Sequence, residues 1–293
     1  MPEASLFFIR LFADDTFLCA QDSELWRLEN IVNTELDKVY KWLVSNKLTL
    51  NYDKCKFMIV SKKKKNSNLS IKINHKDLQQ CDSYKYLGVY VDKKLSWKPH
   101  IDYICKKISK ACGALSKTRH CIGIETLKNI YYALVNSYLR YGISSWGNAS
   151  SEVLKPLNVL INRVVRIMSF APLGRLSQNV QRQIYKHLNI LDVNSTFLLE
   201  TSKFIFKSKN DLLPISTIAK HFNRTSPNLQ HYGFRSRINQ LSVVPLVLLS
   251  EYAKKSIQIQ ENALWDDIPA EIRSSESLKG FKNQYKKFLI EKL

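Results

Sequence analysis

The sequence predicts an α+β fold in which a strand-rich first part is followed by a mostly helical second part. Two features of the apolar pattern support this prediction. Short apolar runs separated by turn residues occupy positions 1–97, with one helical stretch among them, whereas from Pro99 onward apolar residues recur at three- and four-residue intervals. We therefore expect a first domain at 1–97, a helical region at 98–210, and a less regular C-terminal region at 211–293 that ends in a helix.

The first domain is expected to begin with a hairpin, because apolar runs at 6–11 and 17–20 flank the turn-forming stretch 12–16. Helical spacing then predicts a helix that ends near residue 46, with Asp22 or Ser23 as its cap. Strand pieces are expected at 48–50, 57–60 and 69–73. The pattern at 84–92 predicts one further strand, in which Gly88 marks a place where another group could approach the backbone closely.

Helices of the second part are expected at 101–115, 127–139 and 157–168, with shorter ones at 180–191 and 196–209. Prolines punctuate the region that follows, and residues 264–269 form a turn signal before a final helix at 278–289. The apolar stripes of these helices predict a core. Their polar faces are strongly basic, and Lys106, Lys107 and Lys110 are candidate contacts to nucleic acid. Such faces either line a nucleic-acid groove or simply face solvent.

The composition restricts the function classes. Lys and Arg number 45 against 25 Asp and Glu, a formal net charge of +20, which favours a polyanionic partner over a basic protein of no particular affinity. No apolar run approaches the ~18 residues of a membrane span, and no signal peptide is visible, so we expect an intracellular protein that is not secreted. The six cysteines form no CxxC pair, which favours reduced structural thiols.

Asp14 and Asp15 are the candidate chemical groups. In a flat strand, adjacent side chains point to opposite faces, but at a turn both carboxylates can face one site. Paired carboxylates suit Mg²⁺, and two such ions about 4 Å apart can hold the attacking and leaving oxygens of a phosphoryl transfer. The alternative is an ordinary polar hairpin tip, since Asp is a common turn residue. A basic loop at Lys62 to Lys65 is either solvated or a phosphate contact.

Motifs in a defined order resemble the C-terminal portion of the reverse transcriptases of non-LTR retrotransposons of the jockey or LINE type, from the end of the palm through the thumb and beyond. The segment Phe12-Ala13-Asp14-Asp15 looks like the [F/Y]-A-D-D motif of the palm. The segment from Trp42 to Asn51, together with Lys54, is similar to the family's next block. Tyr86-Leu87-Gly88-Val89 looks like the primer-grip hairpin that leads into the thumb. Later blocks also fit, namely Tyr141-Gly142, Trp146-Gly147, Arg235 and Leu264-Trp265.

The resemblance implies RNA-directed DNA polymerisation, with an RNA template, a DNA primer and dNTPs as partners and Mg²⁺ as the cofactor. It implies that Asp14 and Asp15 are catalytic metal ligands and that Lys54 lies near the leaving pyrophosphate, where a cation neutralises developing charge. Tyr86, Leu87 and Gly88 would press on the primer backbone. The family's use of chromosomal primers also suggests a nuclear location.

The chain departs from the family at its start. The family's palm has another catalytic Asp on an upstream strand and a fingers region, whereas only eleven residues precede Phe12, with Glu3 as their sole acid. We therefore expect an N-terminally truncated piece of the polymerase that is inactive alone. The alternatives are a non-catalytic basic nucleic-acid-binding remnant or domesticated module, and a decayed sequence without function.

Overall fold

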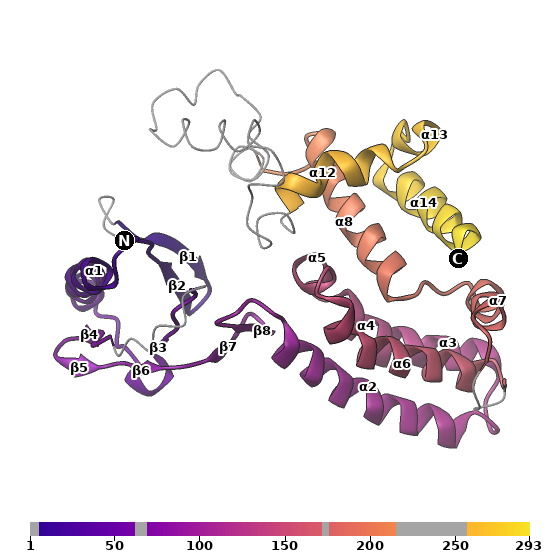
Figure 1. Ribbon diagram of the computed structural model, residues 1–293, viewed down its shortest axis with the longest axis horizontal. Coiled ribbons are helices and arrows are strands. Elements are labelled where there is room, and N and C mark those ends of the chain that lie inside the picture. The colour runs from indigo at the N-terminus through magenta and orange to yellow at the C-terminus, as the bar shows by residue number, and fades with distance from the viewer. Residues whose placement is uncertain (1–5, 62–68, 172–175, 215–256) are drawn as a thin grey trace. The chain divides into compact units, whose positions relative to one another are not determined.

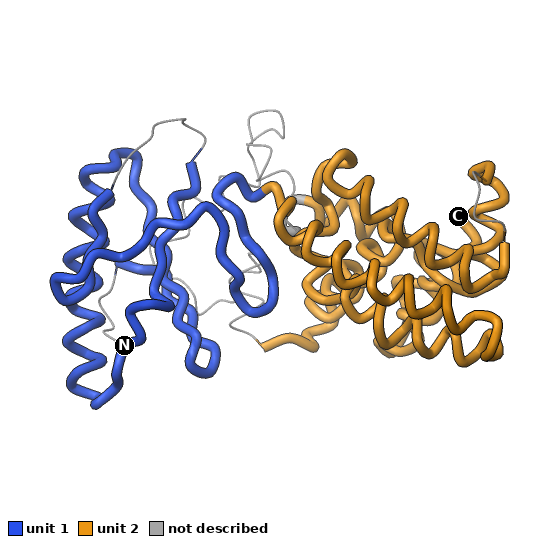
Figure 2. Tube along the Cα trace, turned by 90° about the horizontal axis from the view of Figure 1, so that it is seen from below, with its two compact units in different colours: residues 1–95 blue, residues 96–293 orange. Residues whose placement is uncertain are grey.

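The chain divides into two compact units, residues 1–95 and 96–293, in a computed structural model that describes residues 6–61, 69–171, 176–214 and 257–293 (Figure 1, Figure 2). Unit 1 combines one long helix with small sheets, and the described part of unit 2 is helical. This mixture is compatible with the predicted α+β class. The basic loop at Lys62 to Lys65, Pro227, Arg235 and Pro245 lie outside the described residues.

Unit 1 has short strands that pair two by two. Its elements are β1 (Phe8–Phe12), β2 (Asp15–Cys19), α1 (Leu25–Ser45), the 3₁₀ turn η1 (Tyr52–Lys54), β3 (Lys56–Phe57), β4 (Lys72–Ile73), β5 (Lys76–Asp77), β6 (Gln79–Gln80), β7 (Ser83–Tyr86) and β8 (Val89–Asp92). The pairs β1–β2, β4–β5 and β7–β8 are antiparallel, and β3–β6 is parallel. The predicted hairpin and first helix are confirmed, but the residue that caps the helix is Glu24 and not Asp22 or Ser23. The strand predicted at 48–50 is wrong, because no strand forms there, and of the strand predicted at 57–60 only Phe57 is in a strand.

A small apolar core joins α1 to the strands of unit 1. Its buried members are Phe7, Leu36, Val39, Ile71 and Ile73. The segment around β4 is held to α1 by polar side chains as well, since the Asn33 amide donates to the Ser70 carbonyl at 2.9 Å and accepts from the Lys72 backbone N–H at 2.8 Å. The Asn33 side chain therefore takes hydrogen bonds that a neighbouring strand would otherwise form with this segment. In agreement with this, the strand predicted at 69–73 is reduced to the two residues of β4.

The prediction of one strand at 84–92 is wrong, because a two-residue turn divides the segment into β7 and β8. Leu87 has φ 45° and Gly88 has φ 82°. Two consecutive positive φ values are the backbone feature of a type I′ turn, which matches the twist of the strands that it joins. Glycine at the second position adopts this conformation without steric penalty, whereas Leu87 does not.

Unit 2 consists of helices in the part that the structure describes. They are α2 (Lys98–Thr118), α3 (Ile124–Tyr131), the π-helical segment η2 (Tyr132–Asn136), α4 (Ser137–Arg140), α5 (Ile143–Trp146), α6 (Ser151–Met168), α7 (Gln178–Leu188), α8 (Val193–Lys209), α12 (Ile257–Asp266), α13 (Ala270–Arg273) and α14 (Leu278–Lys292). The predicted helices are confirmed with small shifts of their ends. The turn predicted at 264–269 begins later than expected, because α12 continues to Asp266. None of the described helices is both long and apolar enough to cross a membrane.

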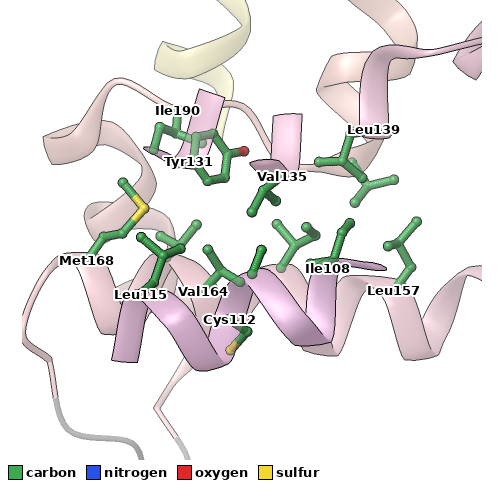
Figure 3. Packing of buried hydrophobic residues seen from close by; sticks show 14 of the residues in the cluster. Ile108, Cys112, Leu115, Tyr131, Val135, Leu139, Leu157, Val164, Met168 and Ile190 are labelled. Carbon is green, nitrogen blue, oxygen red and sulfur yellow. The ribbon is translucent and has the colours of Figure 1, made fainter. Parts of the chain in front are cut away.

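The main core of unit 2 lies where α2, α6 and the continuous segment from α3 through η2 to α4 pack together (Figure 3). Along that segment, Leu127, Tyr131, Val135 and Leu139 are all almost fully buried. They are four residues apart, whereas an α-helix turns once in about 3.6 residues, so a regular helix would rotate each one about 40° further from the core. The wider π turn at η2 removes part of this drift and keeps the four side chains on one face.

A second core in unit 2 lies where α14 packs on α8. Phe281 of α14 is fully buried and stacks on Phe206 of α8 with 4.6 Å between ring centroids. Tyr285 and Leu289 continue the buried side of α14, and Trp265 at the end of α12 stacks on Phe281 at 5.9 Å. These aromatic contacts attach the C-terminal helix to the rest of unit 2 and determine which of its sides is exposed.

Candidate metal and nucleic-acid site

The turn of the first hairpin places Asp14 and Asp15 at its tip. The loop between β1 and β2 is Ala13-Asp14, and Asp15 is the first residue of β2, paired with Phe12. Ala13 has φ 50°, a positive value at the first loop position that is typical of type II′ turns, where glycine is usual. The backbone is therefore strained at Ala13, the residue directly before the two acids.

Both carboxylates are available to a ligand. The side chains of Asp14 and Asp15 are exposed, and neither has a hydrogen bond or an ion pair among the described residues. Their oxygens are the hard donors that Mg²⁺ prefers. No group of three or more His, Cys, Asp or Glu side chains that could hold a metal ion occurs in the described ranges. Among the described residues, Asp14 and Asp15 therefore supply two carboxylate donors with no third side chain of these types beside them.

One face of the hairpin links this tip to the second hairpin. Asp15 and Phe17 are two residues apart on β2, so their side chains leave the strand on the same face. The ring centroids of Phe17 and Tyr86 are 5.3 Å apart, and the ring planes make an angle of 38°. Tyr86 is the last residue of β7, directly before the Leu87-Gly88 turn. The folded chain therefore brings Tyr86 beside the carboxylate hairpin, although the two segments are about 70 residues apart in sequence.

Lys54 is attached to the same second hairpin. It ends η1, its side chain is exposed, and its backbone carbonyl accepts a hydrogen bond from the Tyr84 hydroxyl at 3.4 Å. Tyr84 belongs to β7, two residues before Tyr86. The second hairpin is thus linked to the hairpin of Asp14 and Asp15 by one aromatic contact and to Lys54 by one hydrogen bond. Sequence reasoning missed Phe17 and Tyr84 as the connecting residues, since their aromatic character in strands fits an ordinary core equally well.

The lysines of α2 belong to unit 2. Lys106, Lys110 and Lys117 lie on the side of α2 opposite the apolar side that packs on α6, since each successive residue is rotated by about 100°. All three are exposed, and the described residues supply no ion-pair partner for any of them. Lys107 is half-buried, and its ammonium lies 5.6 Å from the Tyr103 ring centroid. Of the predicted contacts, Lys106 and Lys110 are thus on one open basic face, and Lys107 lies beside it.

Sequence comparison relates the chain to polymerases of mobile elements. It is 23% identical over 179 residues to the RNA-directed DNA polymerase from mobile element jockey of Drosophila melanogaster, over 60% of this chain and 19% of that protein. The corresponding jockey protein of Drosophila funebris is 26% identical over 168 residues, over 56% of this chain and 18% of that protein. A retrovirus-related Pol polyprotein from a type-1 retrotransposable element R1 of Nasonia vitripennis is 23% identical over 111 residues, over 36% of this chain and 27% of that protein.

The chain thus spans about a fifth of the length of the two jockey proteins. No protein-family model matches it, and no solved structure matches it. The sequence relatives confirm the resemblance predicted from the ordered motifs.

Proposed function

We propose that this chain, a sequence relative of the RNA-directed DNA polymerases of non-LTR retrotransposons, acts in RNA-directed DNA polymerisation as part of such a polymerase. Unit 1 corresponds in this proposal to part of the palm, and the helices from α2 onward to the thumb and the region after it. An RNA template and a DNA primer are the partners, and dNTPs are the substrates of the complete enzyme.

The observation that carries the proposal is the contact between Phe17 and Tyr86. It brings the strand that begins with Asp15 beside the hairpin that carries Tyr86, Leu87 and Gly88. A polymerase needs a primer end held next to metal-binding carboxylates, because the attacking oxygen must be positioned about 3–3.5 Å from the phosphorus before it reacts. The second hairpin presents one aromatic ring and a tight turn at this position, which suits contact with a primer backbone.

Asp14 and Asp15 would hold Mg²⁺, which when bound neutralises the charge that develops on the transferred phosphoryl group. Lys54 contributes a positive charge near the leaving pyrophosphate in this proposal. Two Mg²⁺ ions take more protein oxygens than two carboxylates supply. We therefore expect further ligands from residues beyond the described part of this chain or from another polypeptide, and no template-directed synthesis by the chain alone.

Metal binding tests the role of the acid pair. Mn²⁺ titration followed by electron paramagnetic resonance should show a site that is lost in the double variant Asp14→Asn, Asp15→Asn. Asp53→Asn is the matched control, because Asp53 is also an exposed carboxylate at a turn of unit 1. Equal Mn²⁺ binding by the double variant and the control would remove the acid pair from the proposal. Primer extension on an RNA template tests inactivity, which template-dependent synthesis by this chain would contradict.

A second candidate function is non-catalytic nucleic-acid binding, favoured by the open lysine face of α2. Neutralising a phosphate on single-stranded nucleic acid contributes about 0.7 to the slope of log K against log salt. The double variant Lys106→Gln, Lys110→Gln should therefore weaken binding and reduce the slope by roughly 1.4. Lys41→Gln, Lys93→Gln removes the same charge from lysines that are already paired with Asp37 and Asp82. Equal losses in both double variants would show that only net charge matters.

The acid pair discriminates between the two functions. Under polymerisation, the Asp14 and Asp15 variant loses metal binding, and the complete polymerase loses synthesis. If the chain only binds nucleic acid, the same variant retains its nucleic-acid affinity, because the carboxylates have no part in that binding.

A further inference from the structure

The ends of α2 and α6 meet around an exposed aromatic ring. Phe170 lies two residues beyond the end of α6 and is 48% exposed. From the end of α2, the Arg119 guanidinium carbon lies 5.0 Å from the centroid of this ring. The centroid of the His120 ring lies 6.1 Å from it, with an interplanar angle of 67°. Arg119, His120 and Phe170 therefore form one group of side chains from two helices (Figure 1), the Phe170 cluster.

The backbone holds Phe170 in a conformation that phenylalanine seldom adopts. Its φ is 57°, at the position after a helix C-cap where glycine or asparagine is usual. The Ala171 N–H donates to the Arg166 carbonyl at 3.2 Å, the six-to-one hydrogen bond of a Schellman motif. A bulky residue with a positive φ is strained, and such strain is typical of functional positions. Burial of the ring does not explain the choice of phenylalanine, because nearly half of the residue is exposed.

The two cationic members of the cluster offer hydrogen-bond donors. Among the described residues, the Arg119 Nε is buried without an acceptor, and no carboxylate pairs with this guanidinium. His120 is exposed, and an imidazole donates from at least one ring nitrogen. No Asp or Glu occurs at 103–124 or at 153–191, the stretches that contain both helix ends. These two stretches therefore favour an anionic ligand, and the planar guanidinium suits phosphate oxygens.

An exposed aromatic ring beside basic groups is typical of surfaces that bind single-stranded nucleic acid. Unpaired bases stack on aromatic rings while basic side chains contact the phosphates, whereas a duplex keeps its bases within its own stack. We propose that the Phe170 cluster binds one unpaired nucleotide of a single-stranded nucleic acid. Phe170 stacks on the base, and Arg119 and His120 donate hydrogen bonds to a phosphate. This role goes beyond the proposed polymerisation, because it requires neither the metal nor the acid pair.

Fluorescence anisotropy of a labelled single-stranded oligonucleotide with the full chain tests the site. Phe170→Leu keeps an apolar side chain but removes the ring, so it should weaken binding about fivefold or more. The slope of log K against log salt should not change in this variant, because no charge is lost. Phe170→Trp should restore the affinity, since an indole also stacks on a base. Arg119→Gln should instead reduce the slope by about 0.7, the value for one phosphate contact.

Trp26 of α1 provides the matched control. It is an exposed ring with the Arg27 guanidinium carbon 5.4 Å from its centroid, but acids occupy positions 22, 24 and 29 around it in the sequence. Trp26→Leu should therefore leave oligonucleotide binding unchanged. Equal losses in Trp26→Leu and Phe170→Leu would overturn the site. Equal losses in Phe170→Leu and Phe170→Trp would also overturn it, because Phe170 would then only connect the two helix ends.

An abasic oligonucleotide of the same length separates stacking from phosphate contact. Because it has phosphates but no bases, the wild type and Phe170→Leu should bind it equally. The Phe170→Trp variant gives a measurement that does not depend on folding of the leucine variant. Compared with the wild type, it should show additional tryptophan quenching by the ordinary oligonucleotide and none by the abasic one. Absence of this additional quenching would overturn the proposed stacking.

Failure of this site and failure of the proposed function give different results. Oligonucleotide binding that is equal in the wild type and Phe170→Leu would overturn the site and leave polymerisation unaffected. Equal Mn²⁺ binding by the acid-pair variant and its control would count against polymerisation. That result would leave the Phe170 cluster unaffected, because no metal takes part in its binding.

Discussion

Lowering the pH should destabilise unit 2 through His100, whose side chain is only 2% exposed. The imidazole ring lies in the first turn of α2, with its centroid 5.5 Å from that of Trp146 and 6.3 Å from that of Tyr103. Burial lowers the pKa of His100 from 6.5 to about 4, because the charged imidazolium would lose its hydration there.

The direction of the pH effect follows from this lowered pKa. Between pH 6.5 and about 4, the unfolded chain binds a proton at His100 and the folded chain does not. The stabilising contribution of the neutral ring is therefore fully present above pH 6.5 and is lost as the pH falls towards 4. A shift of this size corresponds to about 3 kcal/mol when the loss is complete, and to about 2 kcal/mol near pH 5.

Urea unfolding followed by far-UV circular dichroism measures the effect, since the helices of unit 2 dominate the signal. The pH range is about 7.5 to 5, across which an unperturbed histidine titrates. His100→Gln should lose about 2 kcal/mol less stability over this range than the wild type. His187→Gln is the control, because His187 is exposed on α7, and it should keep the wild-type pH profile. An equally steep loss in His100→Gln and the wild type would refute the assignment of the effect to the buried ring.

Three further substitutions should change stability. Leu87→Asn should stabilise unit 1 by about 1 kcal/mol in urea unfolding, because asparagine tolerates a positive φ better than leucine; a loss would show that the Leu87 side chain contributes more by packing than its backbone strain costs. Phe281→Ala should destabilise unit 2 by about 3–5 kcal/mol, since it removes a fully buried ring that stacks on Phe206; a loss near zero would mean that α14 does not pack on α8 in solution. Glu200→Gln should destabilise unit 2 by roughly 1–3 kcal/mol in calorimetry, because Arg140 Nε at 2.7 Å and Lys203 Nζ at 2.6 Å would lose their shared carboxylate; an unchanged melting temperature would show that solvent already screens this network.

Local patterns in the sequence were sufficient to predict the elements whose conformation depends on nearby residues. Apolar residues at helical spacing predict α2, α6 and α14, because a helix that buries one stripe must repeat it every three or four positions. The hairpin around Asp14 and Asp15 is predictable for a similar reason, since two short apolar runs separated by turn residues have few other ways to pair. The position of both acids at the hairpin tip followed from this local pattern.

Errors arose where conformation depends on partners that are distant in sequence. Periodicity alone predicts one strand at 84–92, because its apolar residues continue through Leu87. The turn between β7 and β8 was indicated only by the resemblance of Tyr86-Leu87-Gly88-Val89 to a family hairpin. The strand expected near Leu48 does not form, whereas the segment around β4 is held partly by the Asn33 side chain. The role of Asn33 in holding this segment cannot be recognised from the periodicity of apolar residues.

The sequence by itself determined the order of the motifs, the pair Asp14 and Asp15, the basic charge, and the relationship to RNA-directed DNA polymerases of mobile elements. Only the tertiary structure decided that Phe17 meets Tyr86. The physical reason is that local conformation depends on the neighbouring few residues, whereas a contact between distant side chains depends on how whole elements pack. The candidate site depends on a contact of this second kind.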